Sequence, residues 1–345
     1  MRYKLLGNSG LRVSEICLGT MTFGEDWGWG TSKEECRKIY DAYRDAGGNF
    51  FDTANFYTNG MSEMLLGEFA QGHRESIVLA TKYTNAPPGK DANAAGNHRK
   101  SMMQAVEASL KRLKTDHIDL YWLHTWDGIT PFDEVLRGFD DLVRQGKILY
   151  AGVSNVPAWW IAQANTFAGL HGWTRFVGLQ VEYSLIERTV ERELLPMSKA
   201  LGLGVTAWSP LSGGWLTGKY AAGRKGGGRL DDEQLRDNAL KTDDRSMAIA
   251  LEVAAIAVEI GSSSAQVALT WLRHRVAPVI PIIGARKIEQ LKDNLASLEV
   301  MLSADQLARL ERVSKIEMGF PHNFFNKELV QAFAFGGMKD LIDRP

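Results

Sequence analysis

Eight short runs rich in β-branched and aromatic residues alternate along the chain with longer segments of helical periodicity. The runs that we predict as strands are residues 16–18, 49–53, 77–82, 118–124, 148–154, 176–183, 204–209 and 279–283. Amphipathic segments lie between them, among them residues 33–46, 99–113, 132–145, 158–168 and 192–201. Eight strands, each followed by a helix, in a chain of 345 residues predict an α/β fold of the (β/α)8 TIM-barrel type, which needs about 250 residues or more. The competing fold, a doubly wound parallel sheet, usually carries a G-x-G-x-x-G string after its first strand, and the sequence has no such string.

Several segments fall outside this repeat. Residues 4–6 and 11–13 flank a Gly-Asn-Ser-Gly turn and predict an N-terminal hairpin that closes the bottom of the barrel. Long loops follow the third strand (84–97) and the seventh strand (211–245), and loops of this length are usually either functional or disordered. Further helices are predicted at residues 245–260, 264–273, 289–298 and 303–313. We therefore expect one domain over residues 1–345, with the barrel at about 14–300 and a C-terminal helix and aromatic tail at about 301–345.

Composition excludes several classes of function. Lys plus Arg is 40 and Asp plus Glu is 41, so no basic excess is available for nucleic acid. The first thirteen residues lack the apolar stretch of a signal peptide, and the most apolar long segment, 248–260, is interrupted by Glu252 and Glu259. Two cysteines, Cys17 and Cys36, are too few for a disulfide framework. We expect a soluble, cytoplasmic protein without a membrane partner, and no feature of the sequence indicates its oligomeric state.

Four polar residues stand at or just after the ends of predicted strands, where barrel enzymes keep their catalytic groups. They are Asp52, Tyr57, Lys82 and His124. Neighbouring strands are about 4.8 Å apart, so the four side chains can converge at the barrel mouth. An ammonium beside a tyrosine stabilises the phenolate and lowers the tyrosine pKa, a carboxylate holds the ammonium in place, and a neutral imidazole can orient a carbonyl oxygen. This set of groups suits the reduction of a carbonyl.

Each of the four also has an ordinary structural interpretation. Asp52 could cap a helix or turn, Tyr57 could lie on the surface, and His124 could be a hydrogen-bonded core residue. A metal-dependent hydrolase is a further alternative, but His124 and Asp52 alone are too few ligands, so we predict no metal site. The catalytic interpretation depends on four compatible residue types falling at consecutive strand ends.

The segment from Asp52 to Tyr57, followed by Gly60, Ser62 and Glu63, resembles the D-T-A-x-x-Y-x-x-G-x-S-E signature of the aldo-keto reductases. Further segments that resemble the family are residues 19–24, 80–82, 119–124, 152–155, 180–183, 208–214 and 284–294, so the resemblance runs from about Arg2 to Arg312. It is greatest with the branch that contains bacterial reductases and the potassium-channel β subunits. The family implies a nicotinamide cofactor that lies extended across the barrel mouth, with Tyr57 as proton donor.

The resemblance also implies which residues hold this cofactor. Those around the nicotinamide and first strand end are Gly19, Thr20, Met21, Asp52, Ser154, Asn155 and Gln180, with Trp208 stacked under the ring. Those along the pyrophosphate are Ser209, Pro210, Leu211, Ser212, Gly213, Gly214, Lys219 and Arg229. Those at the adenosine end are Gly284, Arg286, Gln290, Asp293 and Asn294. A guanidinium at a helix start suits a 2′-phosphate, so NADPH/NADP+ is favoured over NADH, unless Arg286 is a solvated helix residue.

Part of the pyrophosphate segment also approximates a phosphate-binding P-loop. Residues 213–219 match G-x-x-x-x-G-K, but Tyr220 replaces the Ser or Thr that would hold magnesium, and Trp215 is bulky for a phosphate cradle. The whole excursion 211–245, with its many glycines and Lys219, Arg224, Lys225 and Arg229, is expected to be a lid over the cofactor. The alternative is a solvated, disordered loop.

The sequence thus predicts an NADPH-dependent reductase of aldehydes or ketones. The alternative is an NADPH-binding regulatory subunit with little turnover, which is similar to the channel β subunits. His124 favours the enzyme, because those subunits carry Asn at this position. The partner is a small-molecule carbonyl, and an apolar pocket would favour an aromatic or polycyclic one. Aromatic residues that could line that pocket, or could instead be ordinary core residues, are Trp27, Trp29, Phe56, Tyr83, Trp126, Phe320, Phe324 and Phe325.

Overall fold

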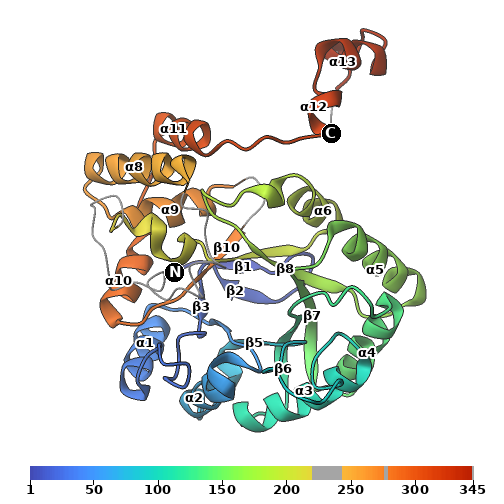
Figure 1. The fold of residues 1–345 in the computed structure, drawn as a ribbon, viewed down its shortest axis with the longest axis vertical. Coiled ribbons are helices and arrows are strands. Elements are labelled where there is room, and N and C mark those ends of the chain that lie inside the picture. The colour runs from blue at the N-terminus through green and yellow to red at the C-terminus, as the bar shows by residue number, and fades with distance from the viewer. Residues whose placement is uncertain (220–242, 276–278, 344–345) are drawn as a thin grey trace.

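Eight parallel strands form a closed barrel in the computed structural model, which describes residues 1–219, 243–275 and 279–343 (Figure 1). The strands are β3 (Cys17–Gly19), β4 (Phe50–Asp52), β5 (Val78–Tyr83), β6 (Ile118–Leu123), β7 (Ile148–Ser154), β8 (Phe176–Glu182), β9 (Gly204–Trp208) and β10 (Val279–Ile283). They follow one another around the ring in chain order, and β10 pairs with β3 to close it. The predicted (β/α)8 barrel is therefore confirmed.

Helices surround the barrel in Figure 1. They are α1 (Lys33–Asp45), α2 (Met61–Phe69), α3 (Arg99–Leu113), α4 (Phe132–Arg144), α5 (Ala158–His171), α6 (Leu194–Leu201), α8 (Asp244–Glu259), α9 (Ser264–Arg273), α10 (Ile288–Ala296) and α11 (Ala304–Ser314). Helix α1 shows why these segments are helical. Ser32 caps its N-terminus by accepting from the backbone N–H of Glu35, Arg44 lies in its last turn, and Ile39, Tyr40 and Tyr43 form the face buried against the barrel.

Helix α2 is absent from the predicted set. Two of its three polar residues, Ser62 and Glu63, are buried, so the helix lacks the separate apolar and polar faces that predict an amphipathic helix. The Glu63 carboxylate accepts from Arg112 of α3 (2.6 Å) and from the Thr81 hydroxyl of β5 (2.6 Å). Partners that are distant in sequence therefore determine this helix.

The bottom of the barrel is closed by an antiparallel hairpin, β1 (Tyr3–Leu5) and β2 (Arg12–Ser14), as predicted. Leu6 and Val13 are fully buried there and pack with Phe50 and Trp122 inside the barrel. Gly7 sits in the turn with φ +57°, and a Cβ at this position would lie 2.4 Å from a backbone carbonyl oxygen. Only glycine allows the hairpin to approach the barrel this closely.

Beyond α11 the chain leaves the barrel as an arm, residues 316–343, that contains the short helices α12 (His322–Phe325) and α13 (Glu328–Ala334) (Figure 1). Within the described residues, no single helix is long and apolar enough to cross a membrane. Helices α8 and α9 reach the necessary length and hydropathy only as a pair, and they are bent by 100° relative to each other.

Candidate active site

A buried ion pair forms the centre of the barrel mouth. Lys82, near the end of β5, is completely buried, and its ammonium pairs with the carboxylate of Asp52 at the end of β4. The same ammonium donates to the backbone carbonyl of Thr53 (2.6 Å). From the other side of the barrel, Gln180 on β8 donates to the second carboxylate oxygen of Asp52 (3.0 Å). Burial works to lower the pKa of Lys82, but Asp52 and Tyr57 outweigh it, so this pKa is raised and the ammonium stays charged.

Tyr57 lies in a turn directly after β4. Thr58 and Asn59 adopt left-handed backbone angles (φ 46° and 54°), and the Thr58 hydroxyl donates to the carbonyl of Phe23 (2.7 Å), which holds the turn in place. The Lys82 ammonium lies 3.4 Å from the Tyr57 hydroxyl and 4.9 Å from the centre of its ring. The turn therefore positions the Tyr57 phenol next to the Lys82 ammonium.

His124 follows β6 and packs edge-on against the Tyr57 ring, with ring centres 5.9 Å apart. Burial and the positive charge of Lys82 hold the pKa of His124 well below its usual value, so the imidazole is neutral near pH 7. Its Nδ1 is buried without a hydrogen-bond partner among the described residues. The four residues predicted from the strand ends are thus brought together in one cluster.

A cavity of about 680 Å³ opens beside this cluster, and Asp52, Tyr57 and His124 lie in its wall. Most of the residues predicted to hold a cofactor line it as well: Gly19, Met21, Asn155, Gln180, Trp208, Ser209, Pro210, Leu211, Gly213, Gly214, Lys219, Gly284, Arg286, Gln290, Asp293 and Asn294. Three others, Thr20, Ser154 and Ser212, are buried behind the wall. Arg229, with Arg224, Lys225 and most of the predicted lid, lies outside the described residues.

Small and apolar residues complete the wall, and the sequence did not single them out. They include Thr22, Thr217, Ala265, Ile282, Ile283 and Ala285. Residues of these types also fill ordinary cores, so only their position after closure of the barrel marks them.

The wall has features that fit a nicotinamide dinucleotide. The Trp208 indole donates to the side-chain oxygen of Asn155 (3.1 Å), and the Asn155 amide donates to the carbonyl of His124 (3.0 Å). These bonds fix a flat aromatic platform beside the cluster of Asp52, Tyr57, Lys82 and His124. Beyond it, Gly213 and Gly214 have φ of 61° and 96°, and a Cβ on Gly214 would lie 3.2 Å from the Lys219 ammonium. Open backbone next to a cation is the arrangement that suits a pyrophosphate.

The far end of the cavity is organised by α1, α9 and α10. The backbone N–H of Arg286 donates to the Gln290 side chain (2.8 Å), and the Arg286 carbonyl accepts from Thr31 (3.3 Å). Asp293 accepts from Ser263 (3.0 Å) and Gln266 (2.7 Å) of the α9 N-terminus. The backbone around Arg286 is therefore held in place without a ligand.

Aromatic residues form one side of the mouth, but not the full predicted set. Trp27 contacts both Trp29 and Phe56, with ring centres 5.5 and 5.8 Å apart, and the latter two line the cavity. The prediction was wrong for Tyr83, which stacks on Tyr121 in the core. Successive side chains of a strand point to opposite faces, so Tyr83 must point outward where Lys82 points inward.

The prediction was also wrong for four other aromatic residues. Trp126 packs edge-on against Trp159, outside the cavity wall. Phe320, Phe324 and Phe325 belong to the arm, which runs away from the mouth (Figure 1).

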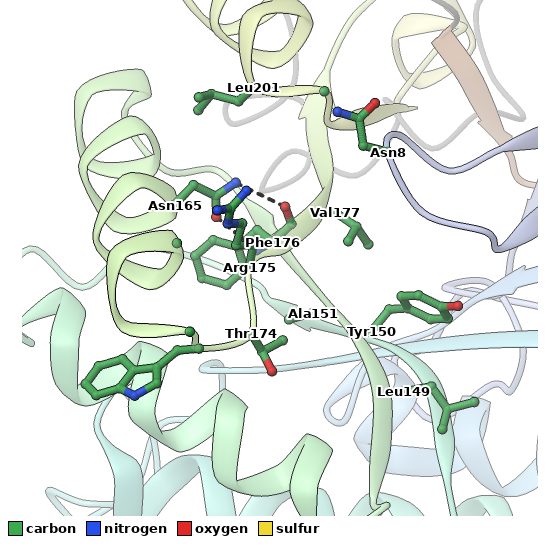
Figure 2. Close-up of a pocket in the computed structure, with 14 residues that line it drawn as sticks. Asn8, Leu149, Tyr150, Ala151, Asn165, Thr174, Arg175, Phe176, Val177 and Leu201 are labelled. Carbon is green, nitrogen blue, oxygen red and sulfur yellow. Dashed lines mark hydrogen bonds between the residues drawn. The ribbon is translucent and has the colours of Figure 1, made fainter.

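A second cavity, of about 500 Å³, lies at the opposite end of the barrel (Figure 2). Its wall includes Tyr150 and Val177 from the N-terminal parts of β7 and β8, with Asn8 from the hairpin turn. Asn165 uses its amide to bond the backbone of Phe176 twice, at 3.1 and 2.9 Å. Among the described residues of this wall, Arg175 carries the charge. Among the residues that the structure describes, this end has no cluster comparable with the mouth, which is the candidate active site.

Comparison with protein families identifies the family of the chain. The chain matches the Aldo/keto reductase family over residues 15–315. It belongs to this family.

Several relatives cover nearly the whole chain. Norsolorinic acid reductase stcV of Emericella nidulans is 38% identical over 92% of this chain and 82% of its own length. A Saccharomyces cerevisiae protein named "Probable aryl-alcohol dehydrogenase AAD4" is 36% identical over 86% of this chain and 93% of its own. A Bacillus subtilis protein named "Uncharacterized oxidoreductase YrpG" is 40% identical over 91% of this chain and 96% of its own. This aldo-keto reductase is thus similar to oxidoreductases.

Proposed function

We propose that this aldo-keto reductase is an NADPH-dependent enzyme that reduces an aldehyde or ketone to an alcohol, with Tyr57 as the proton donor. The observation that carries the proposal is the completely buried Lys82 ammonium, which is paired with Asp52 and lies 3.4 Å from the Tyr57 hydroxyl. A buried charge costs free energy, so a buried ammonium beside a phenol indicates a functional role. Here the positive charge of Lys82 favours loss of the Tyr57 proton.

Each member of the cluster has a separate task. Lys82 stabilises the phenolate that remains after Tyr57 gives its proton to the carbonyl oxygen. Asp52 keeps Lys82 in place and charged. The neutral imidazole of His124 hydrogen-bonds the carbonyl oxygen and orients it toward Tyr57. When bound, the nicotinamide cofactor supplies the hydride that the carbonyl carbon accepts.

The cavity wall supplies the residues that would hold this cofactor. In this proposal Asn155 and Gln180, with Ser154 behind them, bind the carboxamide, and Trp208 stacks on the face of the ring; Asn155, Gln180 and Trp208 line the cavity. The backbone at residues 209–214, with Lys219, suits the pyrophosphate. Arg286 suits the 2′-phosphate, for which a guanidinium makes bidentate contacts, and this favours NADPH over NADH.

The substrate that we propose is an aromatic carbonyl compound in a cytoplasmic setting. The aromatic side of the mouth, formed by Trp27, Trp29 and Phe56, offers flat apolar surface next to the Tyr57 ring. The name of the yeast relative refers to aryl alcohols, which are the reduced products of such carbonyls.

The decisive experiment replaces Tyr57 by Phe. Loss of a general acid lowers kcat by about 10² or more, because the carbonyl oxygen must then take its proton from water. Binding of NADPH, followed by quenching of tryptophan fluorescence, should stay close to that of the wild type. Tyr150→Phe, at the opposite end of the barrel, is the matched control and should keep full turnover.

Two results would count against the proposal. Undiminished turnover in Tyr57→Phe would remove Tyr57 from the reaction. A wild-type protein that binds NADPH but reduces none of a broad panel of aldehydes and ketones would instead favour the regulatory-subunit alternative.

A further inference from the structure

The C-terminal arm, residues 316–343, exposes apolar side chains to an unusual degree. Phe320 is 85% exposed, Phe333 76% and Leu341 75%, and none of the arm's apolar residues belongs to the core of the described structure. On α13, Leu329 and Phe333 stand four residues apart and so share one face. Single exposed apolar residues are common, but a continuous series of them marks an interaction surface.

The size of this surface fits a protein interface. Eight large apolar residues of the arm are at least two-fifths exposed, which amounts to on the order of 900 Å² of side-chain surface. A standard interface buries about 800 Å² on each partner. One arm therefore carries enough apolar area for a stable association, provided that its partner offers an apolar surface in return.

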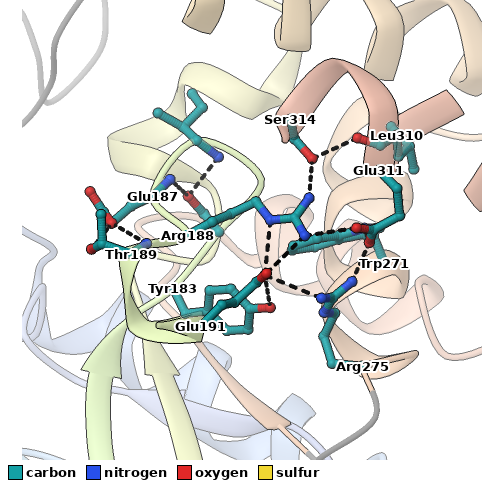
Figure 3. A network of polar contacts seen from close by, with 12 residues as sticks. Tyr183, Glu187, Arg188, Thr189, Glu191, Trp271, Arg275, Leu310, Glu311 and Ser314 are labelled. Atoms are coloured by element: carbon teal, nitrogen blue, oxygen red, sulfur yellow. Dashed lines mark hydrogen bonds and ion pairs between the residues drawn. The ribbon is translucent and has the colours of Figure 1, made fainter. Parts of the chain in front are cut away.

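The point at which the arm leaves α11, around residues 314–317, is called its root here. A polar network fixes the end of α11 at this root (Figure 3). Arg188, which is buried, donates to the Ser314 hydroxyl at the end of α11 (2.6 Å) and pairs with Glu311 (2.7 Å). The guanidinium of Arg188 stacks on the Trp271 ring at 5.1 Å, and that of Arg275 stacks on it at 4.7 Å. The end of α11 is thus held firmly against α9.

One further contact directs the arm. Arg192, beside α6, donates to the backbone carbonyl of Glu317 (2.6 Å) and draws the root toward α6. Figure 1 shows the arm continuing on that side, whereas α8 lies on the other side of α11. The arm is therefore aimed away from the α8 helix of its own chain.

Helix α8 carries an exposed apolar surface that can receive part of the arm. Met247, Leu251, Ala255 and Val258 recur at four, four and three residues, and all four are exposed, Leu251 by 51% and Val258 by 83%. They form the α8 stripe, on the face away from the core. None of these four residues belongs to the apolar clusters of the described structure.

We propose that the arm of one copy docks on the α8 stripe of a second copy, in a reciprocal two-fold exchange. The root of the arm and the stripe lie on the same edge of the molecule, because α11 packs on α8 through Arg309, which pairs with Glu252 (2.6 Å) and Glu259 (2.8 Å). A two-fold axis beside this edge brings each arm onto the stripe of the other copy. Such an exchange buries both apolar surfaces twice and leaves no open end for further copies.

Cysteine cross-linking on mixing tests this exchange, and the chain is suited to it because Cys17 and Cys36 are both buried. Phe333→Cys and Leu251→Cys proteins are prepared separately, mixed, and oxidised mildly. We expect a disulfide-linked dimer that contains one copy of each variant, and little linkage in either variant alone. A Leu170→Cys protein, with an apolar residue on α5 that is 81% exposed, is the matched control and should not link to Phe333→Cys.

Sedimentation of the uncross-linked protein supplies the second measurement. The 38.3 kDa chain should sediment as a dimer at micromolar concentration, and either Phe333→Ser or Leu251→Glu should shift it to the monomer while Leu170→Ser does not. A monomeric wild type would overturn the proposal. So would a dimer that both variants leave intact, or an intramolecular disulfide in the Leu251→Cys/Phe333→Cys double variant, which would show that the arm folds back on its own chain.

Discussion

The two ends of the barrel use the same strands for opposite purposes. On β4, Phe50 and Asp52 point to the same inward face, yet Phe50 packs against Leu6 of the hairpin while Asp52 holds the Lys82 ammonium. At the floor, apolar side chains fill the inside of the barrel, whereas the mouth holds a buried charge cluster beside a large cavity. Two residues along one strand therefore separate a position that stabilises the fold from one that is available for chemistry.

The two ends also differ in how their buried groups are stabilised. At the floor, which is the end of the barrel closed by the hairpin, burying each apolar side chain is favourable by itself, because it removes apolar surface from water. The charges at the mouth are tolerated only as a set, since each buried ion needs the other and the hydrogen bonds that Thr53 and Gln180 provide. The mouth should accordingly be the end that a single substitution disturbs most.

The largest effect on stability is expected from Lys82→Met. It leaves the Asp52 carboxylate buried without its cation, which should lower the free energy of unfolding by about 3–5 kcal/mol, measured by urea denaturation. The double variant Lys82→Met/Asp52→Asn removes both charges and should regain most of this loss. If the double variant is no more stable than the single one, the two charges do not act as a set.

At the floor, Leu6→Ala should lower the free energy of unfolding by about 2–4 kcal/mol, because it opens a cavity between the hairpin and the barrel. Its kcat should stay within about twofold of the wild type, since a loss of stability of this size does not unfold the protein under assay conditions. A large loss of kcat in a Leu6→Ala protein that is still folded would show that the floor also contributes to activity.

Within the mouth, Arg286→Ala tests whether this guanidinium binds the 2′-phosphate of the cofactor. Loss of a charged hydrogen bond to the 2′-phosphate should weaken NADPH binding by roughly 1.5–3 kcal/mol and leave NADH binding almost unchanged. Titration with both cofactors measures this directly. Equal losses for the two cofactors would place the 2′-phosphate elsewhere.

The smallest effect concerns pH and His124. Its pKa in the folded state lies well below the usual 6.5, so below about pH 6.5 the unfolded chain takes up a proton that the folded chain refuses. Stability is therefore complete above that pH and falls as the pH is lowered, by at most about 1.4 kcal/mol per pH unit. Unfolding measured at pH 7.5 and 5.5 should show this difference in the wild type and in Leu6→Ala, and a smaller one in His124→Gln. The same pH dependence in His124→Gln would assign it to other groups.

The sequence by itself determined the barrel and which four residues form the cluster at its mouth. Strands such as Ile148–Ser154 and helices such as Arg99–Leu113 and Ser264–Arg273 have the predicted bounds, because their periodicity and end residues are local properties of the chain. Since the strand ends of a barrel share one face, the polar residues at those ends can be placed together from their positions in the sequence alone.

The tertiary structure decided the contacts that join distant parts of the chain. Gln180 bonds Asp52 across 128 residues, a contact that exists only because the barrel closes. Helix α2 depends on Arg112, and the arm is directed away from the mouth by Arg192 rather than folding its phenylalanines into the pocket. Local patterns determine which segments become strands and helices, but the direction in which a side chain or a terminal segment points depends on the free energy of contacts with residues far away in the sequence.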